Sequence, residues 1–202
     1  TALAAEMALS HSGALAGTDK SYSAVFDRYG VQRVEDMDQL ATALIMFAQP
    51  QAPAAGGIAC LHDSGGERQL LIDLADQYSV PLARLDAPIL DRLKGLLDPG
   101  LPAVNPLDGW GAGGGDAPAN MAACFTALLE STDTALGAVV HDRGPNSEVY
   151  PSYMEYLHQA QGATGKPVFL VANRQGSGSD SLAITSTQGG FPVIDGVSQF
   201  LV

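Results

Sequence analysis

The sequence of 202 residues predicts an α/β protein built on a doubly wound, mainly parallel sheet. From residue 57 onward, short apolar runs typical of buried strands alternate with amphipathic helical patterns, and glycine-rich turns separate them. Apolar residues make up 46% of the chain, which is enough for a sizeable core. These observations favour helices on both faces of a parallel sheet.

The first part of the chain is expected to be separate from this sheet. A run rich in Pro, Ala and Gly at residues 49–57 has the composition of a linker, so we predict domains of residues 1–52 and 53–202. Before the boundary, apolar spacing predicts a helix, a short extended stretch and a second helix, at 19–29, 31–34 and 36–47. This α-β-α tail has apolar faces that need a partner sheet.

The second part supplies the sheet itself. Apolar runs predict strands at 57–61, 80–85, 136–140, 168–172 and 192–194. Helical spacing predicts helices at 67–78, 88–97, 118–130, 147–161 and 180–188. About five strands with helices on both faces fit a flavodoxin-like doubly wound sheet.

Composition excludes several classes of function. The formal net charge is −12, and only ten Lys and Arg are scattered along the chain, so we expect no nucleic-acid partner. No apolar run approaches the ~20 residues of a membrane-spanning helix, so we expect no membrane partner. Cys60 and Cys124 lie in apolar surroundings and predict reduced thiols in a cytoplasmic protein.

A histidine set among small residues near the N-terminus is the first candidate site. Ser10, His11, Ser12 and Gly13 form a segment whose backbone can approach an anion and whose imidazole can act as a nucleophile. We expect His11 on the loop that enters the helix at 19–29, not inside a helix. The pattern predicts a phosphate-handling loop.

A glycine turn after the first predicted strand of the sheet is the second candidate. Ligands of doubly wound sheets bind beyond the carboxyl ends of the strands, where Ser64, Gly65 and Gly66 stand before a helix. Backbone N–H groups at such a helix start can bind phosphate. The alternative is an ordinary turn with Ser64 as N-cap. His62, just before, is interpreted as a structural or solvent-facing ring.

Two further loops carry less specific signals. Asn105 and Asp108 open a glycine-rich passage, which is either an Asn-Pro turn or a loop on the ligand side of the sheet. His141 and Asp142 follow the strand at 136–140, where they form either a turn or a pair that orients an imidazole. No set of His, Cys, Asp and Glu has the spacing of metal ligands, so we predict no metal site.

These motifs together resemble the NDP-forming acyl-CoA synthetases, the succinyl-CoA synthetase superfamily. Residues 10–17 and the helix after them are similar to the family's phosphohistidine loop. Residues 63–66 resemble the glycine turn of its second flavodoxin-like ligase domain. Residues 105–108 and 190–193 are similar to its Asn-Pro-hydrophobic-Asp loop and closing strand. The resemblance implies that residues 1–52 end a first flavodoxin-like domain and that 53–202 form a second.

The resemblance also implies a reaction. A carboxylic acid and CoA are joined at the expense of ATP through an acyl phosphate, and a histidine carries the phosphoryl group. By position His11 would be this catalytic histidine, and the phosphate would be bound by Ser10, Ser12, Gly13, Ser64, Gly65 and Gly66. ATP/ADP with Mg²⁺, CoA and phosphate would be substrates, with no prosthetic group. CoA-binding and ATP-grasp domains of the same enzyme, and an oligomer, are the implied partners.

Some features depart from this pattern or leave alternatives. Asp63 and Glu67 flank the glycine turn and would repel a phosphate unless they are turned away. The chain starts at Thr1, and we expect it to be part of a longer fused ligase. A non-catalytic, ligase-like module that senses ligands is the alternative function, and a flavodoxin-like nucleotide or flavin binder is a third. His11 favours the enzyme because a sensor does not need it.

Overall fold

The computed structural model describes residues 2–12, 18–144, 147–173 and 181–202. The chain divides into two compact units, Thr1–Asp36 and Met37–Val202. No described helix is long and apolar enough to cross a membrane.

The first unit consists of two helices, α1 (Ala2–Ser12) and α2 (Asp19–Tyr29). Thr18 caps α2 by accepting a hydrogen bond from the Ser21 N–H, and Gly30 ends the helix at φ 61°. The extended stretch predicted at 31–34 forms no strand, because a strand needs a neighbouring strand and none pairs with it among the described residues.

The prediction that His11 lies on a loop is wrong. His11 occupies the last turn of α1, together with Ser10 and Ser12. Alanine, leucine and methionine dominate the preceding residues, and these strong helix formers carry the helix through the histidine.

The second unit contains a five-stranded, all-parallel sheet in the order β2-β1-β3-β4-β5. The strands are β1 (Gly57–His62), β2 (Leu107–Asp108), β3 (Thr134–His141), β4 (Val168–Ala172) and β5 (Val193–Asp195). The helices are α3 (Met37–Phe47), α4 (Gly65–Gln77), α5 (Ala87–Leu96), α6 (Ala117–Glu130), α7 (Tyr150–Thr164), α8 (Ser181–Gln188) and α9 (Val197–Leu201). This strand order is that of flavodoxin-like sheets, so the predicted fold class is confirmed.

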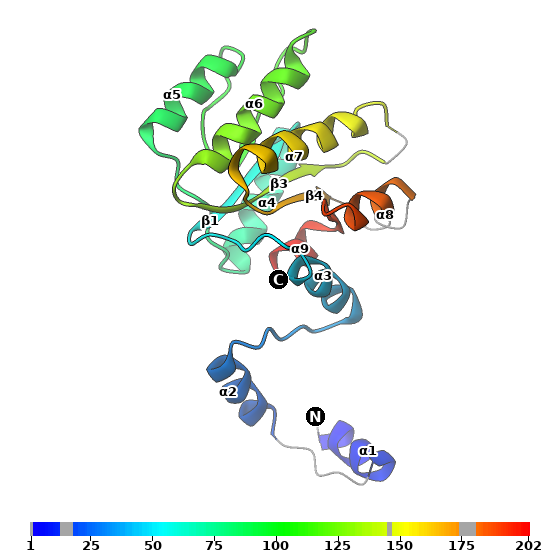
Figure 1. Cartoon of the computed structure of the whole chain (residues 1–202). Helices are drawn as coiled ribbons and strands as arrows, with labels where there is room; N and C mark the ends of the chain where they lie inside the picture. The colour runs from blue at the N-terminus through cyan, green and yellow to red at the C-terminus, as the bar shows by residue number, and fades with distance from the viewer. Residues whose placement is uncertain (1, 13–17, 145–146, 174–180) are drawn as a thin grey trace. The chain divides into compact units, whose positions relative to one another are not determined.

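Helices cover both faces of the sheet (Figure 1). On one face, Ala59 and Leu61 of β1 belong to the core cluster that α5, α6 and α7 complete. On the other face, Ile58 and Cys60 pack in a cluster with α4 and the short α9. Helix α9 was not predicted from the sequence. Because both faces are buried, every residue of β1 is buried. Cys60 and Cys124 are buried free thiols.

The edge of the sheet beside β1 differs from the prediction. The strand predicted at 80–85 makes only an isolated bridge between Leu82 and Ile58, and β2 pairs with the end of β1 instead. The Asn105 side chain lies between these two segments. It accepts a hydrogen bond from the Cys60 N–H (2.9 Å) and donates to the carbonyls of Ile58 (2.9 Å) and Ala83 (3.0 Å). One side chain therefore replaces part of an edge strand.

Helix α3 lies in the same compact unit as the sheet, since the two units divide between Asp36 and Met37. Ile45 and Met46 of α3 pack against the cluster around α4 and α9. The assignment of residues 1–52 to a separate domain stays a prediction.

Candidate functional site

The carboxyl ends of the strands gather ionisable and polar side chains at one edge of the sheet. We call this set the carboxyl-edge cluster; it comprises Asp63, Glu67, Arg68, Asp108, His141, Asp142, Arg143, Tyr153 and Asn173. The cluster lies at the topological switch point of the sheet, between β1 and β3. There the connection that leaves β1 runs toward one edge of the sheet and the connection that leaves β3 runs toward the other. Sheets of this topology bind their ligands at that point.

Helix α4 starts inside this cluster. Ser64 is its N-cap, and the part-buried Ser64 side chain makes no capping hydrogen bond to the helix. A Cβ on Gly65 would lie 3.2 Å from Asp108 Oδ2, so the end of β2 packs close to the helix start. The structure thus brings Ser64, Gly65, Gly66 and Asp108 together. Asn105 lies behind them, with its amide bound to backbone.

The start of α4 suits an anion. The first N–H groups of a helix have no partner within the helix, and the dipole places partial positive charge there. Gly65 and Gly66 are exposed, and neither carries a side chain of its own over these groups, although the Asp108 carboxylate lies close to Gly65. Burial raises the pKa of the Asp108 carboxyl, which lies beside this helix start.

Asp63 is engaged by an aromatic partner. The Tyr153 hydroxyl donates a hydrogen bond to Asp63 Oδ2 (2.6 Å). Burial and this bond raise the pKa of Tyr153, so the phenol keeps its proton. This bond holds the Asp63 carboxylate on the Tyr153 side, while its negative charge remains.

Glu67, in the first turn of α4, and Asn173 are poorly satisfied groups of the cluster. Both carboxyl oxygens of Glu67 are buried and have no hydrogen-bond partner among the described residues, and the same holds for both polar side-chain atoms of Asn173. Burial, with the negative charges of Asp63 and Asp142, raises the pKa of Glu67 to about 7, against an opposing influence of the nearby Asn173 amide. Glu67 can therefore exchange a proton near neutral pH.

Two histidines at the ends of β1 and β3, His62 and the cluster member His141, are buried and neutral. Burial lowers the pKa of His62 to about 3 and that of His141 to about 4. His62 is thus a structural ring. The His141 ring stacks on Tyr153, with centroids 4.9 Å apart, and its Nδ1 accepts a hydrogen bond from the Arg143 N–H. Asp142 forms an ion pair with Arg143 Nε at 3.3 Å. The contacts that orient the His141 ring are therefore the hydrogen bond from the Arg143 N–H and the contact with Tyr153, and not a bond to Asp142.

Tyr153 was not predicted to lie at the site, and Glu67 was predicted only as a charge that flanks the glycine turn. Tyr150, Tyr153 and Tyr156 recur every three residues on α7, and this spacing could have been recognised as one aromatic face of a helix. The pairing of Tyr153 with Asp63 spans 90 residues of sequence, and no local pattern shows it.

The first candidate segment lies in the other compact unit. His11 is exposed at the end of α1, and the Ser10 hydroxyl donates a hydrogen bond to the Met7 carbonyl (2.8 Å) of the same helix. Gly13 lies outside the described residues. The two units are described separately, so a meeting of His11 with the start of α4 stays a prediction.

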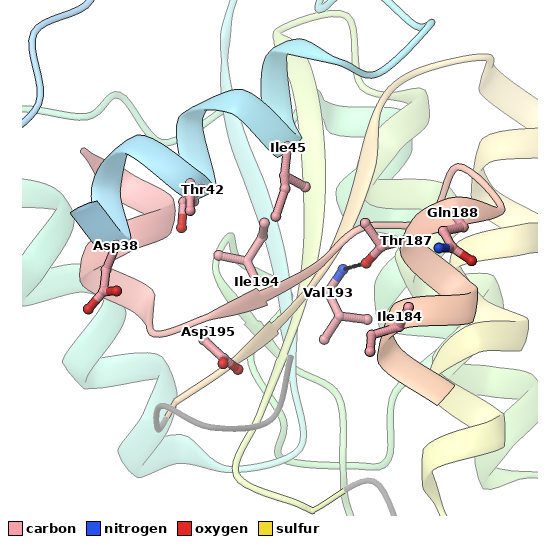
Figure 2. A pocket seen from close by; sticks show the side chains of 10 residues that line it. Asp38, Thr42, Ile45, Ile184, Thr187, Gln188, Val193, Ile194 and Asp195 are labelled. Carbon is pink, nitrogen blue, oxygen red and sulfur yellow. Dashed lines mark hydrogen bonds between the residues drawn. The ribbon is translucent and has the colours of Figure 1, made fainter. Parts of the chain in front are cut away.

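A groove of about 580 Å³ lies between α3, α8 and β5 (Figure 2). Its walls are mainly apolar and include Ile45, Ile184 and Ile194, while its charged residues are the carboxylates Asp38 and Asp195. This charge does not suit a phosphate. No group of three or more His, Cys, Asp and Glu side chains within the described part of the chain could hold a metal ion.

The sheet order and the glycine-started helix at its carboxyl edge define a flavodoxin-like domain. Residues 1–47 match the family described as the succinyl-CoA ligase like flavodoxin domain. The acetate–CoA ligase (ADP-forming) I of Archaeoglobus fulgidus is 31% identical over 165 residues, which are 80% of this chain and 22% of that protein. A trans-feruloyl-CoA synthase from an unknown prokaryotic organism is 31% identical over 137 residues, 68% of this chain and 19% of that protein.

A solved structure has the same fold. Acetyl-coenzyme A synthetase 1 of Ca. Korarchaeum cryptofilum, in complex with phosphate and ADP, superimposes with a TM-score of 0.80 at 17% identity, over all of this chain and 43% of the other. The chain is thus similar in sequence to the succinyl-CoA ligase like flavodoxin domain and to ADP-forming acid–CoA ligase sequences, as its motifs predicted. It spans about a fifth of the length of the two curated relatives above.

Proposed function

We propose that this chain is part of an NDP-forming acid–CoA ligase, which makes acyl-CoA from a carboxylic acid, CoA and ATP. The observation that carries the proposal is the open start of α4, with two exposed glycines and an unbonded Ser64 hydroxyl at the ligand-binding edge of the sheet. The match of residues 1–47 to a CoA ligase family, in the segment that holds His11, supports it.

In this proposal His11 carries the phosphoryl group. A ring nitrogen of His11 attacks the terminal phosphorus of ATP, the P–N bond forms, and ADP leaves. A carboxylate oxygen of the acid then attacks this phosphorus and the P–N bond breaks, which gives an acyl phosphate. The thiol of CoA attacks the acyl carbon, gives up its proton, and phosphate leaves. Exposure of His11 suits a group that must reach more than one partner.

The start of α4 would hold the phosphoryl oxygens during these transfers. The N–H groups of Gly65 and Gly66 and the Ser64 hydroxyl are fixed donors, and such donors stabilise charge that develops on oxygen. Ser12 and Gly13 are proposed to add donors from the histidine side. Asn105 supports the edge from behind, and Asp108 lies on the ligand side.

The remaining requirements belong to the whole enzyme. ATP with Mg²⁺ would bind to an ATP-grasp domain, and CoA to a CoA-binding domain of the same cytoplasmic, oligomeric enzyme. The relatives named above form acetyl-CoA in one case and feruloyl-CoA in the other, so they leave the acid open.

Phosphoryl labelling tests the proposal. The full-length protein is incubated with ATP labelled at the γ-phosphate, and we expect an acid-labile, base-stable label that is absent from His11→Asn. His158→Asn is the matched control, because His158 is also an exposed histidine on a helix. If His11→Asn keeps the label, the proposed carrier is wrong.

The same measurement separates the enzyme from a ligand-sensing module. A sensor binds its ligand without forming phosphohistidine, so wild-type protein that binds CoA but takes no label from ATP or from an acyl phosphate would exclude the ligase.

A further inference from the structure

The first turn of α4 carries the sequence of a capping box that is not formed in the structure. Such a box has Ser or Thr at the N-cap and Glu or Gln three residues later, and Ser64 and Glu67 occupy these positions. In a formed box the hydroxyl accepts from the N–H of the third helical residue, and the carboxylate accepts from the N-cap N–H. Here Ser64 makes no capping bond, and both carboxyl oxygens of Glu67 lack a partner among the described residues.

The backbone of Ser64 is already suited to the box. Its φ of −150° and ψ of 126° are the extended conformation that an N-cap adopts. Its hydroxyl oxygen lies over the helix start, 3.8 Å from the position that a Cβ on Gly66 would take. Formation of the box therefore needs the rotation of two side chains and no refolding of the helix.

Instead of capping the helix, Glu67 is turned into a polar layer between α4 and the sheet. It faces the Asn173 amide, whose two polar atoms are also buried without a partner in the described part of the chain. His62 follows Cys60 by two residues on β1 and so shares the face that packs with α4. It is fully buried, and both of its ring nitrogens are unpartnered as well. Because unsatisfied buried polar atoms cost free energy, this layer holds Glu67 only weakly.

The surroundings of Glu67 decide which protonation state the layer accepts. The described charged groups that act on Glu67 come from the loops after β1 and β3, namely Asp63, Asp142 and Arg143. On the side of β4 it meets the neutral Asn173 amide. Arg68, the next residue of α4, acts on His62 and Asp108. Burial, with two negative charges against one positive charge, therefore disfavours ionised Glu67 in this position.

A carboxylate is stabilised at the start of the helix instead. The N–H groups there have no partner within the helix, and the dipole adds partial positive charge. Burial, followed by the charges of Asp63 and Asp142, raises the pKa of Glu67 to about 7, so both protonation states are populated near neutral pH. Glu67 thus has two positions, and each suits one protonation state.

We propose that Ser64 and Glu67 form a proton-controlled switch that opens and closes the anion site at the start of α4. In the open form described above, Glu67 is turned inward and the N–H groups of the helix start are available. In the closed form, ionised Glu67 accepts from the Ser64 N–H, and the Ser64 hydroxyl accepts from the Glu67 N–H. This form occupies two donors and places a negative charge where an anion would bind. The identity of that anion as a phosphoryl group rests on the proposed function.

Anion binding is then linked to the protonation of Glu67. Only the open form binds, so the apparent dissociation constant rises as the open fraction falls. With a pKa of about 7, the protonated and open fraction falls about tenfold between pH 6 and pH 8. Affinity for an anion should fall by about the same factor.

Sulfate tests this linkage, because it stays a dianion between pH 6 and pH 8 whereas phosphate does not. The 202-residue chain, labelled with ¹⁵N, is titrated with sulfate at both pH values, and the amide signals of Gly65 and Gly66 are followed. We expect about tenfold weaker binding at pH 8 in the wild type and no such difference in Glu67→Gln. Glu155→Gln changes an exposed glutamate of α7 and should behave as wild type. A pH effect that persists in Glu67→Gln would overturn the proposal.

The same spectra without sulfate report the cap itself. We expect the amide signals of Ser64 and Glu67 to shift between pH 6 and pH 8 with one midpoint near the pKa of about 7, because both N–H groups gain acceptors. Glu67→Gln should abolish this titration. Ser64→Ala, which removes the hydroxyl, should abolish it at the Glu67 amide. Signals that do not move in the wild type would show that the box does not form.

The two measurements separate the switch from the proposed function. If sulfate shifts Gly65 and Gly66 with equal affinity at both pH values, the anion site stands and the switch is wrong. If the cap signals titrate but sulfate binds at neither pH, the switch stands and the anion site of the proposed function is wrong. The labelling of His11 tests the ligase independently of both.

Discussion

At the scale of the residue, Glu67 is the group whose state depends most on conditions. Its pKa of about 7 in the folded protein lies above the ordinary value of 4.5, so folding favours the protonated form. The stability that Glu67 contributes is therefore present below about pH 4.5 and is lost as the pH rises through 7.

We predict that Glu67→Gln stabilises the protein at pH 8 and has little effect at pH 5, because glutamine mimics the protonated carboxyl. Although its carboxyl oxygens are covered, Glu67 as a residue is only partly buried, so we expect a gain of about 1 kcal/mol at pH 8, or roughly 2–4 °C in Tm. Thermal unfolding of both proteins at the two pH values measures this. Glu155→Gln, at an exposed position of α7, is the control. Equal shifts at pH 5 and pH 8 would show that Glu67 does not titrate in this range.

At the scale of the element, the edge of the sheet beside β1 depends on one amide. We predict that Asn105→Ala lowers the free energy of unfolding by about 2–4 kcal/mol, because three hydrogen bonds to backbone are lost and the backbone groups stay part-buried. Urea unfolding measures the change. Asn120→Ala, in α6, should cost less than about 1 kcal/mol. A similar small loss in Asn105→Ala would mean that water replaces the amide.

The sequence could predict the elements that are determined by a pattern within a short stretch of neighbouring residues. The strand at 168–172 matches β4 residue for residue, because burial on both faces produces an unbroken apolar run. The prediction of a strand at 80–85 was wrong. Apolar content alone does not show that the Asn105 side chain makes the backbone hydrogen bonds that an edge strand would otherwise make. The glycine turn at 64–66 was visible for a local reason too, namely two glycines before a helical pattern.

The rest of the site could not be predicted in this way. Tyr153 looks like a core residue of α7, and its bond to Asp63 exists only because α7 follows β3, the strand that lies beside β1. The raised pKa of Glu67 results first from burial by the folded chain and then from the negative charges of Asp63 and Asp142 on two different loops. His11 was recognised by its neighbours in sequence, but the helix that contains it was not expected because serine and glycine follow.

At the scale of the whole molecule, the division into two compact units makes a prediction about stability. A chain of residues 37–202 should unfold within about 0.5 kcal/mol of the full 202 residues, because α2 has no buried residue. A chain of residues 48–202 also lacks α3, whose Ile45 and Met46 pack on the core, and should lose about 2–3 kcal/mol. Urea unfolding of the three chains measures this. A loss of several kcal/mol in residues 37–202 would show that the units stabilise each other.

The two ends of the sheet have a consequence for intermolecular association. An exposed edge strand can recruit strands from other molecules and start aggregation. Here β2 has only two residues, and Asn105 occupies the adjoining backbone groups of β1. At the opposite end β5 has three residues, and its Val193 N–H donates to Thr187 Oγ1 (Figure 2). Side-chain amide and hydroxyl groups thus bond the backbone groups that an added strand would need at both edges. They disfavour edge-to-edge polymerisation of the folded sheet.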